Sequence, residues 1–232
     1  MSHSYYQLAT GRVAAIEGNC IFPPLQQALI EPNGLLAIGG DLSADRLLSA
    51  YKQGIFPWFS EGEPVMWWSP SPRMALYPDE LKISKSLAKT LKNNAFEIRI
   101  NTAFQAVITA CSNTPRIDKN GDYAGTWISP DMIGAYCQLH TQGYALSVET
   151  WFNDELVGGC YGVKINRMFY GESMFHTQPN ASKIAFVHLV EYLKSQQVGL
   201  IDCQMKTLLL SSFGGREISR DEFMQSLLKL IE

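Results

Sequence analysis

The sequence lacks the paired cysteines that mark a disulfide framework or a zinc knuckle. Its five cysteines lie far apart, and no two of them form a C-x-x-C pair. They are Cys20, Cys111, Cys137, Cys160 and Cys203. No stretch approaches the run of about eighteen apolar residues that a membrane helix needs, and residues 1–18 show no basic cluster followed by an apolar block. We therefore expect reduced thiols, no signal peptide, no membrane contact and a cytoplasmic location.

Common signatures of phosphate-binding, hydrolytic and metal-dependent enzymes are absent as well. The chain contains no P-loop, no G-x-S-x-G and no H-E-x-x-H, and its four histidines show no ligand spacing among themselves. The glycine-rich segment at residues 158–162 lies in a strand-like stretch, where glycine more often admits a close neighbour than a phosphate. These absences predict that the chain has no metal site.

Positive charge is not in excess. The formal net charge is -3 and the pI is about 5.8, so a uniformly basic surface that coats nucleic acid is not expected. One local exception lies in residues 82–92, where four lysines at spacings of three and four predict one side of a helix. They are Lys82, Lys85, Lys89 and Lys92. A solvated helix face explains such a stripe, but the lack of interleaved acids leaves contact with RNA phosphates open.

The chain of 232 residues is 46% hydrophobic and 18% charged, which suffices for one large domain or two small ones. Turn-forming residues dominate the first third, and only one helix is clear there, from Ser43 as N-cap to Gly54. Longer periodic segments begin near residue 75. We predict a small irregular N-terminal domain over residues 1–74 and a regular α/β domain over residues 75–232.

In the second domain the pattern predicts four helices and five strands. The helices are expected at residues 82–92, 102–111, 130–143 and 181–196, and the strands at residues 96–100, 144–152, 155–165, 168–175 and 200–203. Short turns join the three long strands into an antiparallel meander, which a helix and a further strand follow. This order predicts a mixed sheet flanked by helices.

Polar residues stand out in two otherwise apolar segments. Glu172 interrupts a predicted strand, while Asp202 and Gln204 lie two residues apart and are expected on the same face of a strand. Buried acids need partners or a function, so either structural hydrogen bonding or chemistry could explain them. Aromatic residues beside prolines, among them Trp58 and Trp127, could pack in the core or stack on nucleobases.

Longer blocks of the sequence resemble the leucyl/phenylalanyl-tRNA protein transferases. The first blocks are EPNGLLAIGGDLS from Glu31, AY from Ala50, GIFPW from Gly54, and WWSP followed by PR from Trp67. Further blocks are GTWI from Gly125, LVGG from Leu156, GESMF from Gly171, NASK from Asn180 and IDCQ from Ile201. The resemblance covers nearly the whole chain in order, and several blocks are long and unusual in composition.

This resemblance implies a C-terminal domain like the GNAT acyltransferases and an enzyme that moves leucine or phenylalanine from aminoacyl-tRNA to an acceptor protein whose N-terminus is Lys or Arg. It implies no cofactor, because the aminoacyl ester is already activated. The product would carry a destabilising N-terminus for protein degradation, and the enzyme is expected to act as a monomer.

By the same resemblance, Asp202 and Gln204 match a catalytic pair, and Glu172 matches the acid that helps to place the incoming amine. Residues matching the aminoacyl pocket are Cys160, Phe169, Met174 and Ile201. Residues matching the holders of the terminal adenosine are Trp58 and Trp127, with Tyr51 nearby. An apolar pocket containing a flexible Met suits either side chain and disfavours a polar one. Because an amide has negligible basicity, we expect Gln204 to orient the amine.

Four departures from the family pattern stand out. The family usually has His where this chain has Leu209, and Gly-Ala where it has Gly214-Gly215. Cys160 lies where a bulkier Met can occur, and residues 114–123 form a longer polar insertion.

Two rival functions stay open. An acetyl-CoA-dependent acetyltransferase should carry a glycine-rich pyrophosphate loop, which Asn180-Ala181-Ser182-Lys183 does not supply. A non-catalytic binder of tRNA or of basic N-termini would bind without turnover.

Overall fold

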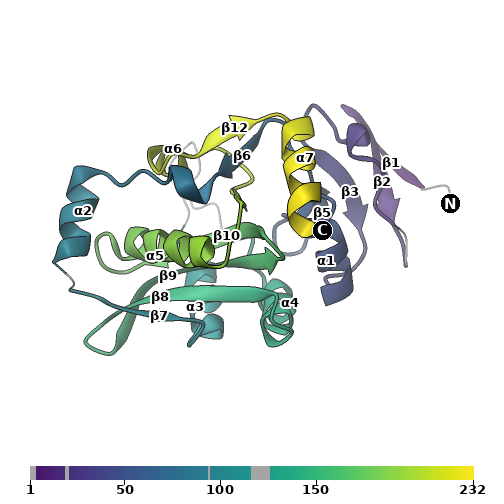
Figure 1. The fold of residues 1–232 in the computed structure, drawn as a ribbon. Helices are drawn as coiled ribbons and strands as arrows, with labels where there is room; N and C mark the ends of the chain where they lie inside the picture. Colours follow the sequence, from purple (N-terminus) through teal and green to yellow (C-terminus); the bar gives the residue numbers. More distant parts are fainter. Residues whose placement is uncertain (1–3, 19–20, 94, 116–125) are drawn as a thin grey trace.

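The computed structural model describes residues 4–18, 21–93, 95–115 and 126–232. Two β-sheets lie side by side, the smaller built from N-terminal residues and the larger covered by helices on both faces (Figure 1). Within the described ranges, no helix is both long and apolar enough to cross a membrane. Most of the predicted insertion at residues 114–123 lies outside the described residues.

The smaller sheet has five strands in the spatial order β1, β2, β3, β5, β4. Their bounds are β1 Tyr5–Leu8, β2 Gly11–Ile16, β3 Leu35–Gly39, β4 Phe56–Pro57 and β5 Met66–Trp68. The strands β2 and β3 are parallel, and the other pairs are antiparallel. Helix α1 (Ala44–Tyr51) begins as predicted, because the Ser43 hydroxyl accepts a hydrogen bond from the Arg46 backbone N–H. The turn-rich sequence did not indicate this sheet.

The larger sheet has seven strands in the order β12, β6, β11, β10, β9, β8, β7. Their bounds are β6 Arg73–Leu76, β7 Glu97–Ile100, β8 Ala145–Phe152, β9 Glu155–Ile165, β10 Met168–His176, β11 Leu200–Asp202 and β12 Arg216–Ile218. Among these described strands only β10 and β11 pair in parallel, so the prediction of a mixed sheet is confirmed. The boundary between residues 74 and 75 stays a prediction; β6, which spans it, belongs to this sheet.

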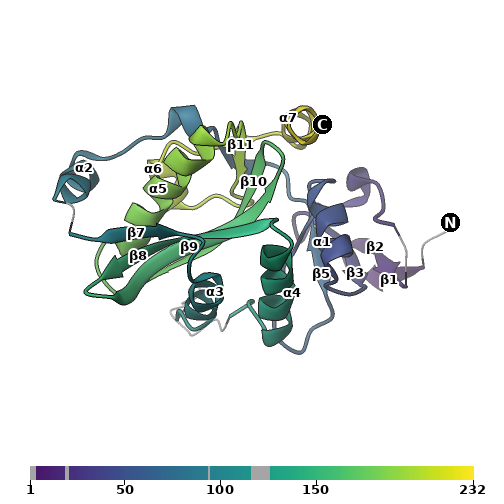
Figure 2. The same cartoon turned by 60° about the horizontal axis from the view of Figure 1, so that its bottom comes forward.

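Helices cover the larger sheet on both sides. The longer helices are α3 Phe104–Ser112, α4 Pro130–Thr141, α5 Ala181–Ser195 and α7 Arg220–Ile231. The shorter ones are α2 Lys85–Lys92, α6 Leu208–Ser212 and the 3-10 turns η1 Leu25–Gln27 and η2 Pro78–Glu80. Helix α5 packs on one face of the sheet and α3 and α4 on the other (Figure 2), so each face has its own apolar core.

The first turn of α5 lies very close to β9. A Cβ atom at Gly158 would stand 2.6 Å from the Ala181 Cβ and 2.8 Å from the Ala181 carbonyl carbon. A side chain at this position would therefore push the helix away from the sheet. The prediction that glycine here admits a close neighbour is confirmed.

The predicted helix at residues 82–92 is wrong at its start. Helix α2 begins at Lys85, because the Ser84 hydroxyl accepts the Leu87 backbone N–H and caps it. Lys82 precedes the helix, and its backbone N–H donates to the Phe213 carbonyl at 2.9 Å. The lysine stripe on the helix therefore consists of Lys85, Lys89 and Lys92, and Lys82 is not part of it.

Candidate active site

A cavity of about 500 Å³ opens where the smaller sheet meets the larger one. Its walls come from the segment after β4, from β9 and β10, and from the region between β11 and α6. Seven of the predicted site residues line it: Trp58, Trp127, Cys160, Glu172, Met174, Ile201 and Gln204. Leu209 also belongs to the wall. Asp202, Phe169 and Tyr51 are fully buried and do not line it.

Glu172 lies at an irregularity in strand β10. The register against β9 shifts between Gly171 and Ser173, so Glu172 is the extra residue of a β-bulge. Tyr170 before the bulge and Met174 after it belong to the cores on opposite faces of the sheet, although both have even numbers. Glu172 thus stays on the face of Tyr170 and Tyr51, and the bulge lets Met174 reach the other face.

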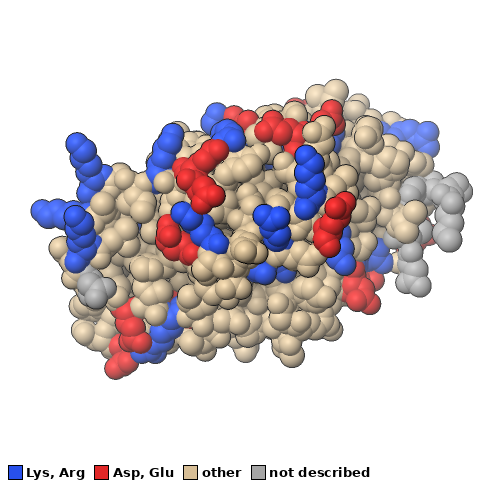
Figure 3. Space-filling view, viewed as in Figure 1, with Lys and Arg blue, Asp and Glu red and all other residues tan. Residues whose placement is uncertain are grey.

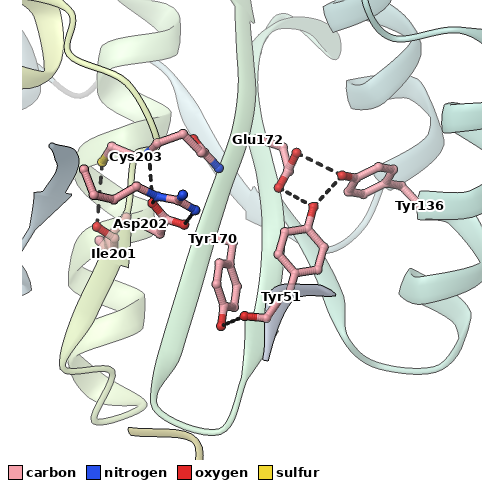
Figure 4. A network of polar contacts seen from close by, with 9 residues as sticks. Tyr51, Tyr136, Tyr170, Glu172, Ile201, Asp202 and Cys203 are labelled. Carbon is pink, nitrogen blue, oxygen red and sulfur yellow. Dashed lines mark hydrogen bonds and ion pairs between the residues drawn. The ribbon is translucent and has the colours of Figure 1, made fainter. Parts of the chain in front are cut away.

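Two tyrosines hold the Glu172 carboxylate. The Tyr51 hydroxyl donates to one oxygen at 2.6 Å and the Tyr136 hydroxyl to the other at 3.0 Å, and the two hydroxyl oxygens also lie next to each other (Figure 4). Tyr51 is in turn fixed through its carbonyl, which accepts from the Tyr170 hydroxyl at 2.8 Å. Burial raises the pKa of Glu172 to about 7, although the two tyrosine hydrogen bonds lower it.

Asp202 forms a buried ion pair with Arg73. The carboxylate oxygens accept from Arg73 Nε at 2.8 Å and from its Nη2 at 2.7 Å, and both side chains are almost fully excluded from water. The guanidinium lies between the rings of Phe56 and Phe223, at 4.7 and 4.8 Å from their centroids. Residues of the smaller sheet and of α7 therefore fix the orientation of Asp202.

The prediction that Asp202 and Gln204 share one face of a strand is wrong. Strand β11 ends at Asp202, and Gln204 has a φ of 53°, in the left-handed region. The Gln204 backbone N–H donates to Asp202 Oδ1 at 2.9 Å, and this bond holds the turn. Because of the turn, Gln204 lines the cavity while Asp202 lies behind it.

One part of the cavity wall is apolar. Cys160 and Met174 are directly opposite each other on β9 and β10, and Ile201 comes from β11. Phe169, the register partner of Ile201, packs in the core behind them. Burial raises the pKa of the Cys160 thiol, so it is uncharged at neutral pH. This wall can hold an aliphatic or aromatic side chain.

Trp58 and Trp127 supply the aromatic part of the wall. Trp58 is 39% exposed, and its ring meets that of Trp68 edge to face with the centroids 5.5 Å apart. The indole N–H of Trp68 donates to the Trp58 carbonyl at 2.6 Å and fixes the backbone there. Tyr51, predicted near the adenosine, is buried and donates a hydrogen bond to Glu172.

The sequence did not predict two polar residues of the site, Arg73 and Tyr136. Arg73 was recognised only as part of a sequence block, although a buried acid at Asp202 called for a cationic partner. Tyr136 follows the apolar pattern of α4, and nothing in its spacing distinguishes it from a core tyrosine. Within the described part of the chain, no group of three or more His, Cys, Asp or Glu could hold a metal ion.

The Glu172 carboxyl group can bind an amine or exchange a proton with it. A carboxyl group with a pKa near neutrality can hold an ammonium group or accept a proton from it at physiological pH. It lines the same cavity as an apolar pocket and two tryptophans. The cavity can therefore bring an amine close to a ligand that carries both an apolar side chain and an aromatic base.

Comparison with known proteins places the chain among a defined group of sequences. The family model described as leucyl/phenylalanyl-tRNA protein transferase matches residues 75–228, and the model of that family's N-terminal domain matches residues 40–71. The transferase of Chromobacterium violaceum is 59% identical over 89% of this chain and 87% of its own. The transferase of Nitrosomonas eutropha is 60% identical over 91% of this chain and 88% of its own.

The similarity to solved structures is weaker, both in sequence identity and in TM-score. The structure of L-PGS from Bacillus licheniformis aligns with a TM-score of 0.42 at 10% identity, over 81% of this chain and 70% of that one. A GCN5-related N-acetyltransferase from Kribbella flavida aligns with a TM-score of 0.39 at 8% identity, over 74% of this chain and 60% of that one.

Proposed function

Because this chain belongs to the leucyl/phenylalanyl-tRNA protein transferase family, we propose that its cavity is where the aminoacyl ester meets the acceptor amine. The chain is an aminoacyltransferase, which moves leucine or phenylalanine from tRNA to the N-terminus of a protein. One observation carries the assignment of the site: Glu172, with a pKa of about 7, lines the same cavity as an apolar pocket. The new N-terminus would mark the acceptor for degradation.

The donor occupies the apolar and aromatic walls in this proposal. The leucyl or phenylalanyl side chain lies against Cys160, Met174 and Ile201, where a polar amino acid would lose hydrogen bonds to water without replacement. The terminal adenosine stacks on Trp58 and Trp127, whose rings line the cavity. Phe169 supports this pocket from the core without contacting the donor.

The acceptor amine lies beside Glu172. The carboxylate attracts the ammonium group and then accepts a proton from it, and the freed amine nitrogen attacks the ester carbonyl carbon. A peptide bond forms as the bond from the carbonyl carbon to the ribose oxygen breaks, and the ribose oxygen takes the proton that the attacking nitrogen loses. Placing the two reactants together can supply about 7 to 11 kcal/mol of the barrier reduction. A Lys or Arg first residue adds a second positive charge that suits the carboxylate.

Asp202 and Gln204 act together in this scheme. Gln204 lines the cavity and orients the amine through its side-chain amide, which is not itself a base. Asp202 is a positioning residue, because it holds the Gln204 backbone in the left-handed turn and is itself held by Arg73. The resemblance implied that Asp202 and Gln204 form a catalytic pair; in this scheme Asp202 acts only through Gln204.

A direct assay tests the proposed function. The purified protein is mixed with leucyl-tRNA and peptides that begin with Arg, Lys or Ala, without ATP, coenzyme A or metal, and peptide masses are followed. We expect a gain of one leucyl residue at the N-terminus of the Arg and Lys peptides and little on the Ala peptide. Binding of tRNA without any mass gain would instead indicate a binding protein, and acetylation after addition of acetyl-CoA would indicate an acetyltransferase.

We predict that Tyr136→Phe shifts the pH dependence of transfer upward. The Tyr136 hydroxyl stabilises the Glu172 carboxylate, so its loss raises the pKa of Glu172 above about 7. The acidic limb of kcat/KM should move to higher pH by roughly half a unit to one unit, while the plateau at high pH changes little. A pH series of kcat/KM measures this shift. An unchanged limb would show that Glu172 does not set it.

The α2 lysines provide a separate prediction about tRNA. Lys and Arg side chains gather over α2 at the left of the molecule (Figure 3), and the helix itself carries no acidic residue. Replacing Lys85, Lys89 and Lys92 together by Ala should raise the KM for leucyl-tRNA about tenfold and leave kcat unchanged. The slope of affinity against salt should also become shallower. Unchanged affinity at low salt would leave the stripe as a solvated face.

A further inference from the structure

A second, smaller cavity lies beside the active site. It has a volume of about 140 Å³ and is enclosed by the segment leading into α2, the first turn of α5 and the end of α6. Two lysines line it, Lys82 before α2 and Lys183 in α5, together with several hydroxyl groups and Asn180. None of the described residues that line it is acidic. A concave polar site with two cations and no acid in its described wall is suited to an anion.

Both lysines are available for a ligand. The two acids that lie closest before Lys82 in the chain are paired elsewhere, Asp79 with Lys194 and Glu80 with Arg216. Among the described residues, neither Lys82 nor Lys183 has an ion-pair partner. The backbone of Lys82 is nevertheless fixed, because its N–H donates to the Phe213 carbonyl. This bond fixes the backbone from which the Lys82 side chain extends along the cavity wall.

The small cavity adjoins the cavity that we propose to hold the aminoacyl end of the tRNA. Leu209 lines both the small cavity and the active-site cavity, so this side chain separates them at that point. On its other side, Ser84 and Ser86 line the cavity and flank Lys85, the first lysine of the α2 stripe. The small cavity thus lies between the proposed site of the aminoacyl ester and the lysines proposed to contact tRNA.

We infer that this cavity binds a backbone phosphate in the single-stranded 3′ end of the aminoacyl-tRNA. The inference rests on the proposed function and adds a subsite to it. Lys82 and Lys183 neutralise the phosphate charge, while the hydroxyls of Ser84 and Ser86 and the amide of Asn180 line the cavity as further hydrogen-bond donors. Phosphate contacts of this kind fix the position of the RNA strand along its binding site. They would therefore set the distance between the aminoacyl ester and Glu172.

The test compares two donor analogues that differ in their phosphates. One is 3′-leucylamido-adenosine, which has none, and the other is the CCA trinucleotide ending in the same leucylamide. Neither can react, so affinities are measured by calorimetry without turnover. In the unmodified protein the trinucleotide should bind at least about tenfold more tightly, and its affinity should fall with salt.

The double variant Lys82→Met, Lys183→Met keeps the aliphatic stems and removes both charges. It should bind the trinucleotide about tenfold more weakly than the unmodified protein does, and 3′-leucylamido-adenosine equally well. The slope of log affinity against log salt should decrease by about 0.7 for one lost phosphate contact. A matched control is Lys194→Met, Lys206→Met, which removes two lysines that are paired with Asp79 and Glu217. This control should change neither affinity.

Each other outcome is decisive. A double variant that binds the trinucleotide as tightly as the unmodified protein overturns the phosphate subsite, and so does an equal loss for both analogues. If the trinucleotide binds no more tightly than the nucleoside in the unmodified protein, the subsite is also excluded. If the unmodified protein binds neither analogue while leucyl transfer is absent, the proposed function fails instead.

Discussion

In the Asp202→Asn variant, transfer falls about 100-fold or more and the free energy of unfolding falls by about 3–5 kcal/mol. Both effects have one cause. The substitution removes the charge that compensates Arg73, which stays buried between two aromatic rings, and it weakens the acceptor of the Gln204 N–H. Steady-state kinetics and urea denaturation measure the two effects separately. Full activity in this variant would contradict the positioning role of Asp202.

A second variant separates stability from catalysis. Replacing the pair together, as Arg73→Met with Asp202→Leu, removes both charges, and exchanging a buried ion pair for apolar groups is often neutral or stabilising. We expect this double variant to recover most of the lost stability but not the transfer, because the Gln204 turn still lacks its acceptor. Recovery of transfer would show that Asp202→Asn acted only by destabilising the fold.

Replacing Glu172 by Gln should lower kcat/KM about 100-fold to 1000-fold at neutral pH and change its pH dependence. In the unmodified enzyme Glu172, with a pKa of about 7, must be ionised before it can take the proton of the bound ammonium group. The value of kcat/KM should therefore rise with pH with a midpoint near 7. In Glu172→Gln the acceptor amine, with a pKa of about 8, must lose its proton to solvent, so the midpoint should move to about 8. An unchanged midpoint would exclude Glu172 from proton transfer.

The same substitution tests the electrostatics of the fold. The pKa of Glu172 is raised from its ordinary value of 4.5 to about 7, so the folded protein binds the proton more tightly than the unfolded chain does. Its contribution to stability is present below pH 4.5 and is lost as the pH rises through about 7. Denaturation of Glu172→Gln between about pH 4 and 8 should show a weaker loss of stability with rising pH. Parallel curves would contradict the raised pKa.

The regular part of the fold was predictable because its apolar spacing is strong. The strand at residues 155–165 was predicted with the bounds of β9, and the predicted helix at residues 181–196 exceeds α5 by one residue. These segments form the core, where periodicity and burial agree. The smaller sheet was missed because its strands are two to six residues long and separated by prolines and glycines, which indicate turns.

The site was predictable in residue identity but not in geometry. Family resemblance pointed to Glu172 and Gln204, yet a strict alternation along the strands gave no sign of the bulge at Glu172 or the left-handed turn at Gln204. Both features break the period of two on which such reasoning depends. Arg73 is 129 residues from Asp202 in the chain, so only tertiary structure brings the pair together.

The location of the aminoacyl site is the claim on which the mechanism depends. A crystal structure with bound 3′-leucylamido-adenosine tests it most directly. We expect the leucyl side chain against Cys160 and Met174, the adenine ring on Trp58 or Trp127, and the amide carbonyl within reach of an amine held at Glu172. A ligand bound elsewhere, with the cavity empty, would contradict the assignment of the active site.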